Sequence, residues 1–485
     1  MKTRVTDYWI YRWRYPIGYT SIIVAISIVI LIASLYVPGS LRSAEQIAAI
    51  ASGKLSMESI SPQMVVDLPY HILQRVSFML FGVTTLSIKL PSIMLGALTA
   101  AGIFLLIRTW FRRNVAVLTA ILATTCTQFL FLVQDGTPAI MFSFLTIWTL
   151  FAATYVTRKK LFSTLWKVLT GVLMATALYT PLGIYLVLAV MTTTFFHPHI
   201  RHVITHFARP RLVIAMMLGL LSIVPVVYAS VLDYHVVLAL LGFPEGQIDL
   251  KANLSSVAHS LFGFASPADG FLLRPVYSLG LMLLMLVGVY KLVTYKHTAR
   301  SYITLMLGGL MIPLVILDPT HVGALYPLAV LMIALGLATL ITDWYKLFPR
   351  NPYARVGGLI PLGIMVSSIV IAGVLRYMNN YEYNPGVLKD YSSDLQLIQD
   401  QMRYQRATKS QPAVVVVAES EKPFYDLVSH FDTRFITSTT HAASSPRVTV
   451  VTHAAYHATK PPIEPTLIVT SRFANTADRL YVYTK

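Results

Sequence analysis

The sequence predicts an all-α polytopic membrane protein that carries a small C-terminal extracytoplasmic α/β domain. Hydrophobic residues fill 55% of the 485 positions, charged residues fill 12%, and the mean hydropathy is +0.64. This composition excludes an ordinary soluble domain. A membrane-spanning helix needs about 17–25 apolar residues. We count about eleven such runs, at residues 17–37, 88–107, 114–133, 138–157, 164–179, 181–196, 212–232, 272–292, 301–317, 322–342 and 356–376.

The net charge of +17 is distributed as membrane topology requires. Lys and Arg gather in alternate loops, and most acids lie in the loops between them. This positive-inside pattern predicts a cytoplasmic N-terminus, and eleven crossings place the residues after Arg376 outside. We therefore expect a multi-pass protein of the cytoplasmic (inner) membrane that contacts membrane lipids and binds no nucleic acid.

The single cysteine and the absent motifs limit the chemistry. Cys126 falls within the third apolar run, so neither an intrachain disulfide nor a cysteine-based zinc site can form. The sequence holds no Walker loop, GxGxxG or HExxH motif. Four histidines between His197 and His206 are interpreted as part of a basic interfacial loop. We expect no metal and no cofactor.

Residues 38–88 are the first long polar stretch and are expected to form the first extracytoplasmic loop. Residues 43–51 predict a short helix on the membrane surface, with Ile47, Ile50 and Ala51 facing the membrane and Glu45 turned sideways or away from it. This one loop of an otherwise apolar chain holds three acids: Glu45, Glu58 and Asp67.

A second helix of this loop is predicted at Leu68–Phe81. Asp67, His71 and Arg75 recur every four residues, so they share one face if the helix is continuous. Pro69 is compatible only with the first turn.

Three later segments complete the external side. The tight turn Gln134–Pro138 carries Asp135, residues 233–271 form the second large extracytoplasmic loop, and Asp318–His321 is the last external turn. From residue 377 the composition becomes that of a soluble domain, which divides the chain into a transmembrane domain at 1–376 and an extracytoplasmic domain at 377–485. The expected elements of this domain are helices at 387–406 and 423–431 and strands at 413–417, 447–451, 466–469 and 480–483.

A carboxylate at the outer membrane boundary can act as a general base on an acceptor hydroxyl, and nearby cations can hold a phosphate leaving group. The external side offers few membrane-proximal cations, among which Arg75, Lys89 and Arg274 are candidate phosphate ligands. A structural interpretation stays open for each group. The cations suit snorkelling at helix ends, Asp67 suits a helix N-cap, Asp135 suits a turn, and Glu45 suits a solvated helix face.

Three short strings follow one another in a distinctive order. They are Leu68-Pro69-Tyr70, Leu80-Phe81-Gly82-Val83 and Lys89-Leu90-Pro91-Ser92, and the hairpin LLIRTWFRRNVAVLTAIL comes next. This order resembles the GT-C membrane glycosyltransferases, in particular the protein-O-mannosyltransferase and aminoarabinose-transferase branch, whose strings run like PPLYY, LFG and RLPS. The resemblance covers residues 17–200 and extends to the rest by topology.

The resemblance implies a GT-C-like fold and an inverting transfer of a sugar from a polyprenyl-phosphate donor on the outer face of the membrane. The family's catalytic Asp precedes a Glu, whereas here Ala44 precedes Glu45. A second family acid follows the third span in a string like ARPDML, where this chain has Ala139. The family Arg of RLPS is Lys89, which keeps the charge and loses the bidentate fork.

The first hypothesis is a membrane glycosyltransferase that uses a polyprenyl-phosphate-linked sugar and a glycan, lipid or protein acceptor of the cell envelope. Glu45 is then the base, with Asp67 or Asp135 assisting. Its candidate substrate-binding residues are Tyr70, His71, Arg75, Lys89, Arg274 and His321.

The alternative hypothesis is a catalytically inactive GT-C-like scaffold that binds lipid or glycan, for which Ala44 is the main argument. A transporter ranks third, because the predicted spans contain almost no charged residues.

Overall fold

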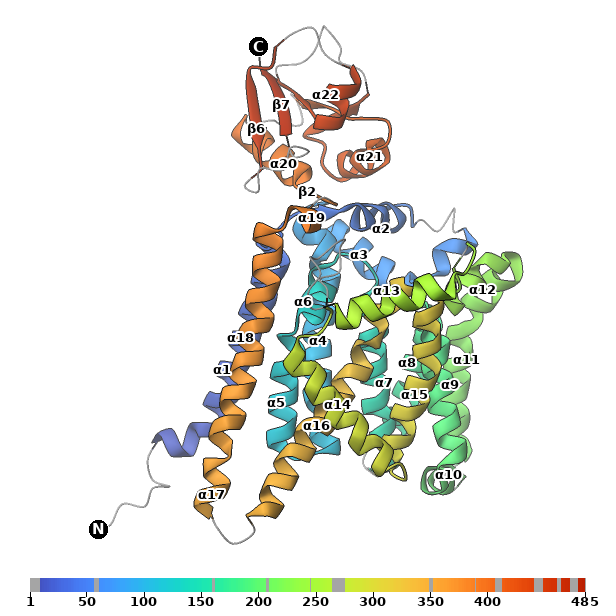
Figure 1. Ribbon diagram of the computed structural model, residues 1–485. Helices are drawn as coiled ribbons and strands as arrows, with labels where there is room; N and C mark the ends of the chain where they lie inside the picture. The colour runs from blue at the N-terminus through green and yellow to red at the C-terminus, as the bar shows by residue number, and fades with distance from the viewer. Residues whose placement is uncertain are drawn as a thin grey trace.

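The computed structural model describes residues 9–55, 61–158, 162–205, 209–244, 246–263, 275–348, 352–388, 390–405, 412–439, 448–459, 464–471 and 479–484. Most of these residues form a helical bundle, and a small mixed sheet stands at one end of it (Figure 1). The chain is therefore mostly helical with a small C-terminal α/β part, as the sequence predicts.

Each of the eleven expected apolar runs forms a helix or a pair of helices within the described residues. The helices are α1 (Trp9–Leu35), α4 (Thr85–Trp110), the pair α5 (Arg113–Thr124) and α6 (Thr127–Gln134), α7 (Ile140–Arg158), α8 (Ser163–Ala177), α9 (Gly183–Phe196), α11 (Arg209–Leu232), α14 (Leu279–Thr294), α15 (Ala299–Leu317), α16 (Tyr326–Leu347) and α18 (Leu359–Tyr383). Among the described residues, six helices are long and apolar enough to span a membrane, or up to nine if each bent pair is one span. Two shorter apolar helices are α8 and α14.

The third run differs from expectation because it is broken rather than continuous. α5 and α6 meet at an angle of 62°. The hydroxyls of Thr124 and Thr125 bond back to carbonyls of α5, and Cys126 then takes an extended conformation at the start of α6. Backbone bonding by threonine hydroxyls of this kind bends or ends helices.

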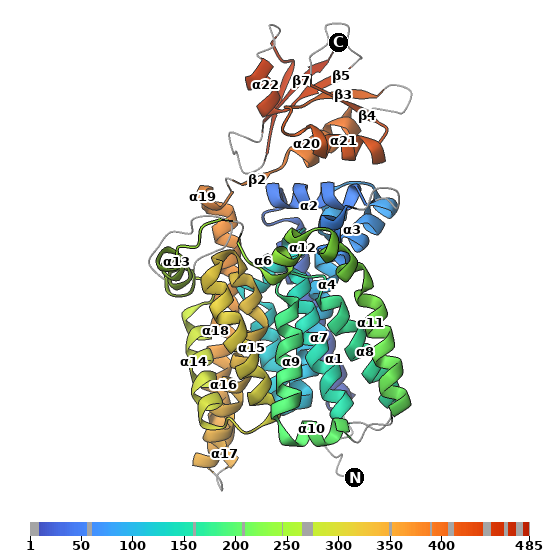
Figure 2. The ribbon, with the colours of Figure 1, turned by 90° about the vertical axis from the view of Figure 1, so that its right-hand side faces the viewer.

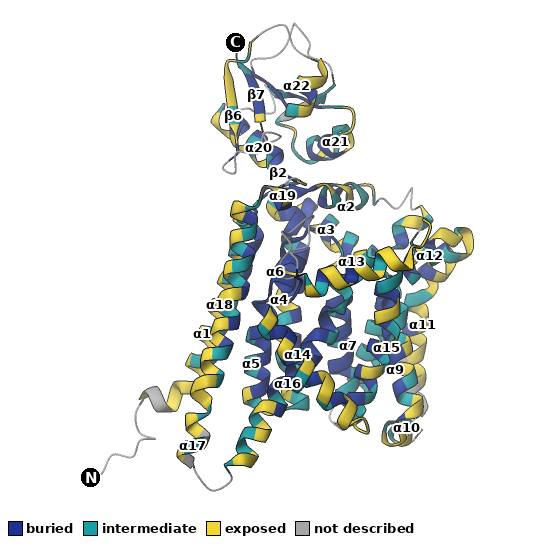
Figure 3. Ribbon diagram, viewed as in Figure 1, coloured by how far each residue is buried: buried dark blue, intermediate teal, exposed yellow. Residues whose placement is uncertain are grey.

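α1 and α18 meet near their C-terminal ends, where a hydrogen bond runs from the Tyr377 hydroxyl to the Ala33 carbonyl (3.1 Å). Much of the surface of both helices is exposed (Figure 3). Because these exposed side chains are largely apolar, they suit contact with lipid tails.

A layer of short helices covers the end of the bundle that faces the sheet (Figure 2). It contains α2 (Ser43–Gly53), η2 (Pro62–Val65), α3 (Leu68–Phe81), α12 (Tyr234–Leu241) and α13 (Leu250–Phe262). Both helices expected in the first loop are present, and α3 has the expected bounds. Glu45 was expected to turn sideways or away from the membrane, and this expectation is wrong, because its side chain is fully buried.

The C-terminal sheet has the strand order β4-β3-β5-β7-β6. β3 (Ala413–Val416) is parallel to β4 (Phe435–Ser438) and β5 (Val448–Val451), and β7 (Arg479–Thr484) is antiparallel to β5 and to β6 (Leu467–Thr470). The helices are α20 (Asp394–Tyr404), α21 (Lys422–Phe431) and α22 (His453–Thr459). The sequence analysis found four of these strands and α21, and missed β4 and α22.

The predicted helix at 387–406 is interrupted in the structure. α19 (Pro385–Leu388) is followed by the short strand β2 (Tyr391–Ser392), and α20 begins only at Asp394. β2 pairs antiparallel with β1 (Leu41–Arg42), in the segment between α1 and α4. This pairing outweighs local helix propensity and ties the two polar segments together.

Candidate active site

Glu45 lies in the first turn of α2 and points into the protein. Its Oε2 accepts the backbone N–H of Arg42 at 2.7 Å, and its Oε1 accepts the backbone N–H of Gly136 at 2.6 Å. Burial is the main cause that raises the pKa of this carboxyl, Asp135 adds to the effect, and Lys89 and the two N–H groups oppose it. Glu45 therefore binds a proton more readily than an exposed glutamate.

Lys89 lies in α4 beneath α2, and its side chain is fully buried. Its Nζ is 3.6 Å from Glu45 Oε1 and donates to Gln134 Oε1 at 3.0 Å. Gln134 in turn donates from Nε2 to the Tyr391 hydroxyl at 2.9 Å. The buried ammonium is thus connected through one amide to the segment after the last long helix.

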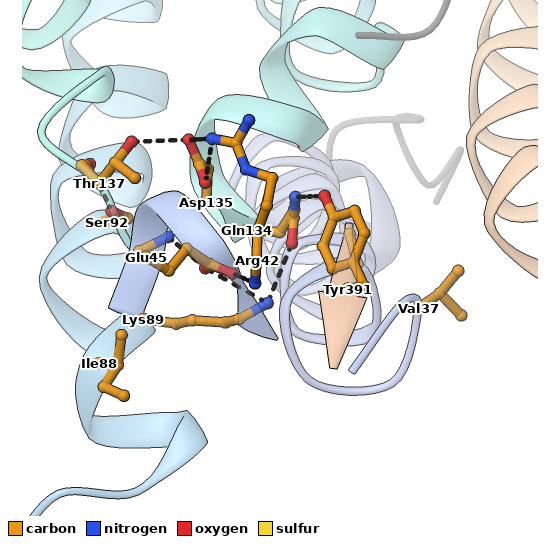
Figure 4. Close-up of polar contacts among 12 residues, drawn as sticks. Val37, Arg42, Glu45, Ile88, Lys89, Ser92, Gln134, Asp135, Thr137 and Tyr391 are labelled. Atoms are coloured by element: carbon orange, nitrogen blue, oxygen red, sulfur yellow. Dashed lines mark hydrogen bonds and ion pairs between the residues drawn. The ribbon is translucent and has the colours of Figure 1, made fainter. Parts of the chain in front are cut away.

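A second ion pair lies beside the first (Figure 4). One guanidinium nitrogen of Arg42 is 2.9 Å from both carboxylate oxygens of Asp135, and the Thr137 hydroxyl donates to Asp135 Oδ2 at 2.6 Å. Arg42, Glu45, Lys89 and Asp135 are hereafter the charge cluster. Its two positive and two negative side chains are each at most 10% exposed.

Gly136 allows the turn before α7 to approach α2 this closely. A Cβ at position 136 would lie 2.9 Å from Ile88 Cγ2 and 3.0 Å from Glu45 Oε1. The backbone N–H of Gly136 can reach the Glu45 carboxylate because no side chain stands between them.

Burial of the charge cluster costs stability, but the same groups can also take part in a reaction. Burying ion pairs is expensive, and the interior attraction seldom does more than offset the desolvation. Carboxylates and cations placed together at the end of a bundle are also the groups that a transfer reaction needs for proton removal and phosphate binding.

Tyr70 and His71 lie next to the charge cluster without joining it. The buried Tyr70 hydroxyl is 2.8 Å from Ser92 Oγ, which donates to the Thr137 carbonyl. His71 Nδ1 is 2.8 Å from Ser52 Oγ, and burial lowers its pKa to about 4, so the ring is neutral at pH 7. Both side chains pack the interface of α3 with its neighbours.

Arg75 and His321 make other contacts. Arg75 donates to the Gly53 carbonyl at 2.8 Å and lies 5.1 Å from the centre of the Phe431 ring. His321 lies in η3 (Pro319–Leu325), and its Nε2 is 3.5 Å from Oδ2 of Asp318, the residue that precedes this helix. Arg274 lies outside the described residues.

Asp67 occupies the N-cap position of α3 but does not act as a side-chain cap. Its φ is 55°, and its backbone N–H donates to the Tyr179 carbonyl at 2.7 Å. Burial raises its pKa to about 7, and the neighbouring Thr180 hydroxyl partly opposes this shift. The structure therefore places Glu45, Lys89 and Asp135 together and places Asp67 against the loop between α8 and α9.

Three members of this network were not singled out from the sequence: Arg42, Gln134 and Tyr391. Arg42 was visible only as one of a few external cations, and Gln134 only as the neighbour of Asp135. Tyr391 carries no local signal, because its partner Gln134 lies 257 positions earlier in the chain.

Comparison with known proteins places this arrangement in context. The family described as dolichyl-phosphate-mannose-protein mannosyltransferase matches residues 69–228, from the first turn of α3 into α11. No curated protein matches the chain. ArnT from Cupriavidus metallidurans bound to undecaprenyl phosphate is similar in structure, with 13% identity, a TM-score of 0.51, and coverage of 96% of this chain and 97% of ArnT.

Two further solved structures are similar with lower scores. The apo state of the same ArnT has 14% identity and a TM-score of 0.49, and covers 96% of this chain and 98% of that one. The apo oligosaccharyltransferase of Archaeoglobus fulgidus has 12% identity and a TM-score of 0.49, and covers 88% of this chain and 65% of that one.

The chain is therefore a multi-pass membrane protein whose fold is similar to that of ArnT. The match to the family described as dolichyl-phosphate-mannose-protein mannosyltransferase covers residues 69–228, which is less than half of the chain. The resemblance expected from the sequence is confirmed.

Proposed function

We propose that the protein transfers a sugar from a polyprenyl-phosphate donor to an acceptor of the cell envelope. The observation that carries this proposal is the charge cluster, which lies at the sheet end of a GT-C-type bundle and draws Lys89 and Asp135 from the family-matched region. The similarity to ArnT, solved with undecaprenyl phosphate, supports a lipid-phosphate donor. The proposed topology keeps the N-terminus cytoplasmic and the sheet outside.

Glu45 is the proposed base, because burial raises its pKa and so makes its carboxylate a stronger proton acceptor. Lys89 is the proposed ligand of the donor phosphate, with Arg42 beside it. Both oxygens of Glu45 already accept backbone N–H groups. An acceptor hydroxyl therefore reaches Glu45 only when α2 moves away from the Gly136 turn, so the described arrangement is a closed one.

A second candidate function is a non-catalytic scaffold that binds lipid or glycan. The observation that favours it is the internal balance of the charge cluster, in which each cation faces a carboxylate. Ala44 and Ala139, at the positions of the family acids, point in the same direction. This candidate predicts that donor is bound and not consumed.

The test is donor turnover by the Glu45→Gln variant in lipid nanodiscs. Loss of a general base costs about 100-fold or more in rate, so we expect release of free polyprenyl phosphate to fall at least that far while donor binding persists. Glu382→Gln, at an exposed position near the end of α18, is the matched control and should keep wild-type turnover. A folded Glu45→Gln protein with full turnover would remove Glu45 from the mechanism.

A further inference from the structure

A cavity lies between α4 and α7 at the end of the bundle opposite the sheet. Its volume is about 430 Å³, and its lining residues are Leu105, Arg108, Thr109, Thr154, Tyr155 and Arg158. This volume falls within the range of about 300–1,000 Å³ that is usual for small-ligand sites. It lies at the other end of α4 from Lys89 and shares no residue with the charge cluster.

Arginines from three helices converge on this region. Arg108 comes from the last turn of α4 and Arg158 from the last turn of α7. Arg300, near the start of α15, donates to the Trp110 carbonyl, and Arg158 donates to the Thr109 carbonyl. Arg158 and Arg300 are close enough for their like charges to oppose each other.

No carboxylate neutralises these arginines within the described part of the chain. The acid described at this end of the bundle is Asp343 of α16, and it pairs with Lys346. The side chain of Arg108 makes no hydrogen bond or ion pair with the described residues. Like charges held together without a counter-ion form a site for an anion.

The location of the cavity at the membrane boundary indicates which kind of anion it binds. α4 and α7 are both long enough to span the membrane, so their last turns lie at its boundary. Aromatic side chains surround the same level: Trp110 donates to Thr154, and Tyr155 stacks on Trp166 with ring centres 4.6 Å apart. Such aromatic belts mark the depth of lipid headgroups, and guanidinium groups match phosphate oxygens in geometry.

We propose that the cavity between α4 and α7 binds the phosphate of an anionic phospholipid headgroup through Arg108 and Arg158. Leu105 borders the cavity on the membrane side, where the acyl chains would leave it. The proposal is independent of glycosyl transfer, because the site uses other residues at the other end of the bundle.

The experiment is native mass spectrometry of the full-length protein with phosphatidylglycerol or phosphatidylcholine added from mixed micelles. We expect selective retention of phosphatidylglycerol, reduced at least fivefold in Arg108→Gln. Arg201→Gln, an exposed arginine of α10 (Pro198–Thr205), is the control and should retain the lipid. Arg158→Lys keeps the charge and loses the fork, so it should weaken binding without unfolding α7.

Three outcomes would overturn the proposal. The first is equal retention of both lipids, and the second is an equal loss in Arg201→Gln, which would indicate diffuse attraction to the surface. The third comes from a competition arm with inorganic phosphate. If millimolar phosphate displaces the lipid and binds with the same dependence on Arg108, the site is one for free phosphate.

Discussion

Asp67 is a buried carboxyl outside the charge cluster. Its Oδ1 lacks a hydrogen-bond partner in the described part of the protein. The loop geometry at φ 55° holds Asp67 in place through its backbone rather than through its side chain. Protonation of the Asp67 carboxyl is therefore coupled to folding.

We predict that Asp67→Asn removes a pH dependence of stability. The pKa is about 7 in the folded protein and near 3.8 when unfolded, so the folded state binds more protons between these values. Stability then falls as pH rises through this window and is lowest above pH 7. At about 1.4 kcal/mol per pKa unit, the effect is on the order of a few kcal/mol.

Thermal unfolding at pH 5 and pH 8 checks this. Asp67→Asn should gain stability relative to wild type mainly at pH 8, where the wild-type carboxylate is charged. Asp426→Asn, at an exposed position of α21, serves as the control. An advantage of the same size at both pH values would show that the proton on Asp67 is not responsible.

At the scale of elements, the bundle depends on close contact between α14 and α16. A Cβ at Gly336 would lie 2.1 Å from the Leu284 carbonyl oxygen, and one at Gly288 would lie 2.1 Å from the Met332 carbonyl oxygen. Small residues at both helices let the backbones touch, which is how helices associate inside membranes.

Gly336→Ala should therefore destabilise the protein by about 1–3 kcal/mol, because the helices must separate to admit one methyl group. Gly309→Ala in α15 is the matched control, since a Cβ at that position would meet nothing within 4 Å and alanine favours helix. Thermal unfolding of both variants in the same detergent measures the difference. A Gly336→Ala protein as stable as wild type would mean that α14 and α16 do not touch in this way.

At the scale of the whole molecule, the sheet is connected to the charge cluster and is not a free appendage. β1 pairs with β2, Gln399 donates to the Val83 carbonyl, and Phe431 packs edge-on against Phe78. Buried residues of α2, α3 and the sheet form one apolar cluster. Movement of the sheet is therefore coupled to the position of α2.

Tyr391→Phe tests this connection. The change leaves the buried Gln134 amide without its acceptor, which costs about 1–3 kcal/mol, and it loosens the contact that orients Lys89. We expect a lower unfolding temperature together with weaker donor binding. Tyr404 is 78% exposed, so the control variant Tyr404→Phe should change neither quantity. If donor affinity is unchanged in Tyr391→Phe, the contact through Tyr391 does not influence donor binding.

The sequence predicted those parts of the molecule that depend on local pattern. Apolar runs and turn residues located the long helices, α3 and most of the sheet, because hydropathy and periodicity are properties of neighbouring residues. The inward orientation of Glu45 was not predictable in this way, because it depends on the N–H of Gly136, 91 positions later. The Arg42–Asp135 pair, 93 positions apart, is likewise a product of tertiary packing.

The most direct measurement follows wild-type protein in lipid nanodiscs with a mixed pool of polyprenyl-phosphate sugars and a cell-envelope extract that supplies acceptor hydroxyls. Mass spectrometry would record bound donor and free polyprenyl phosphate over time. The account predicts donor consumption with release of free polyprenyl phosphate. Donor that stays bound and intact, in protein that is folded by thermal unfolding, would contradict the transferase and establish the binding scaffold instead.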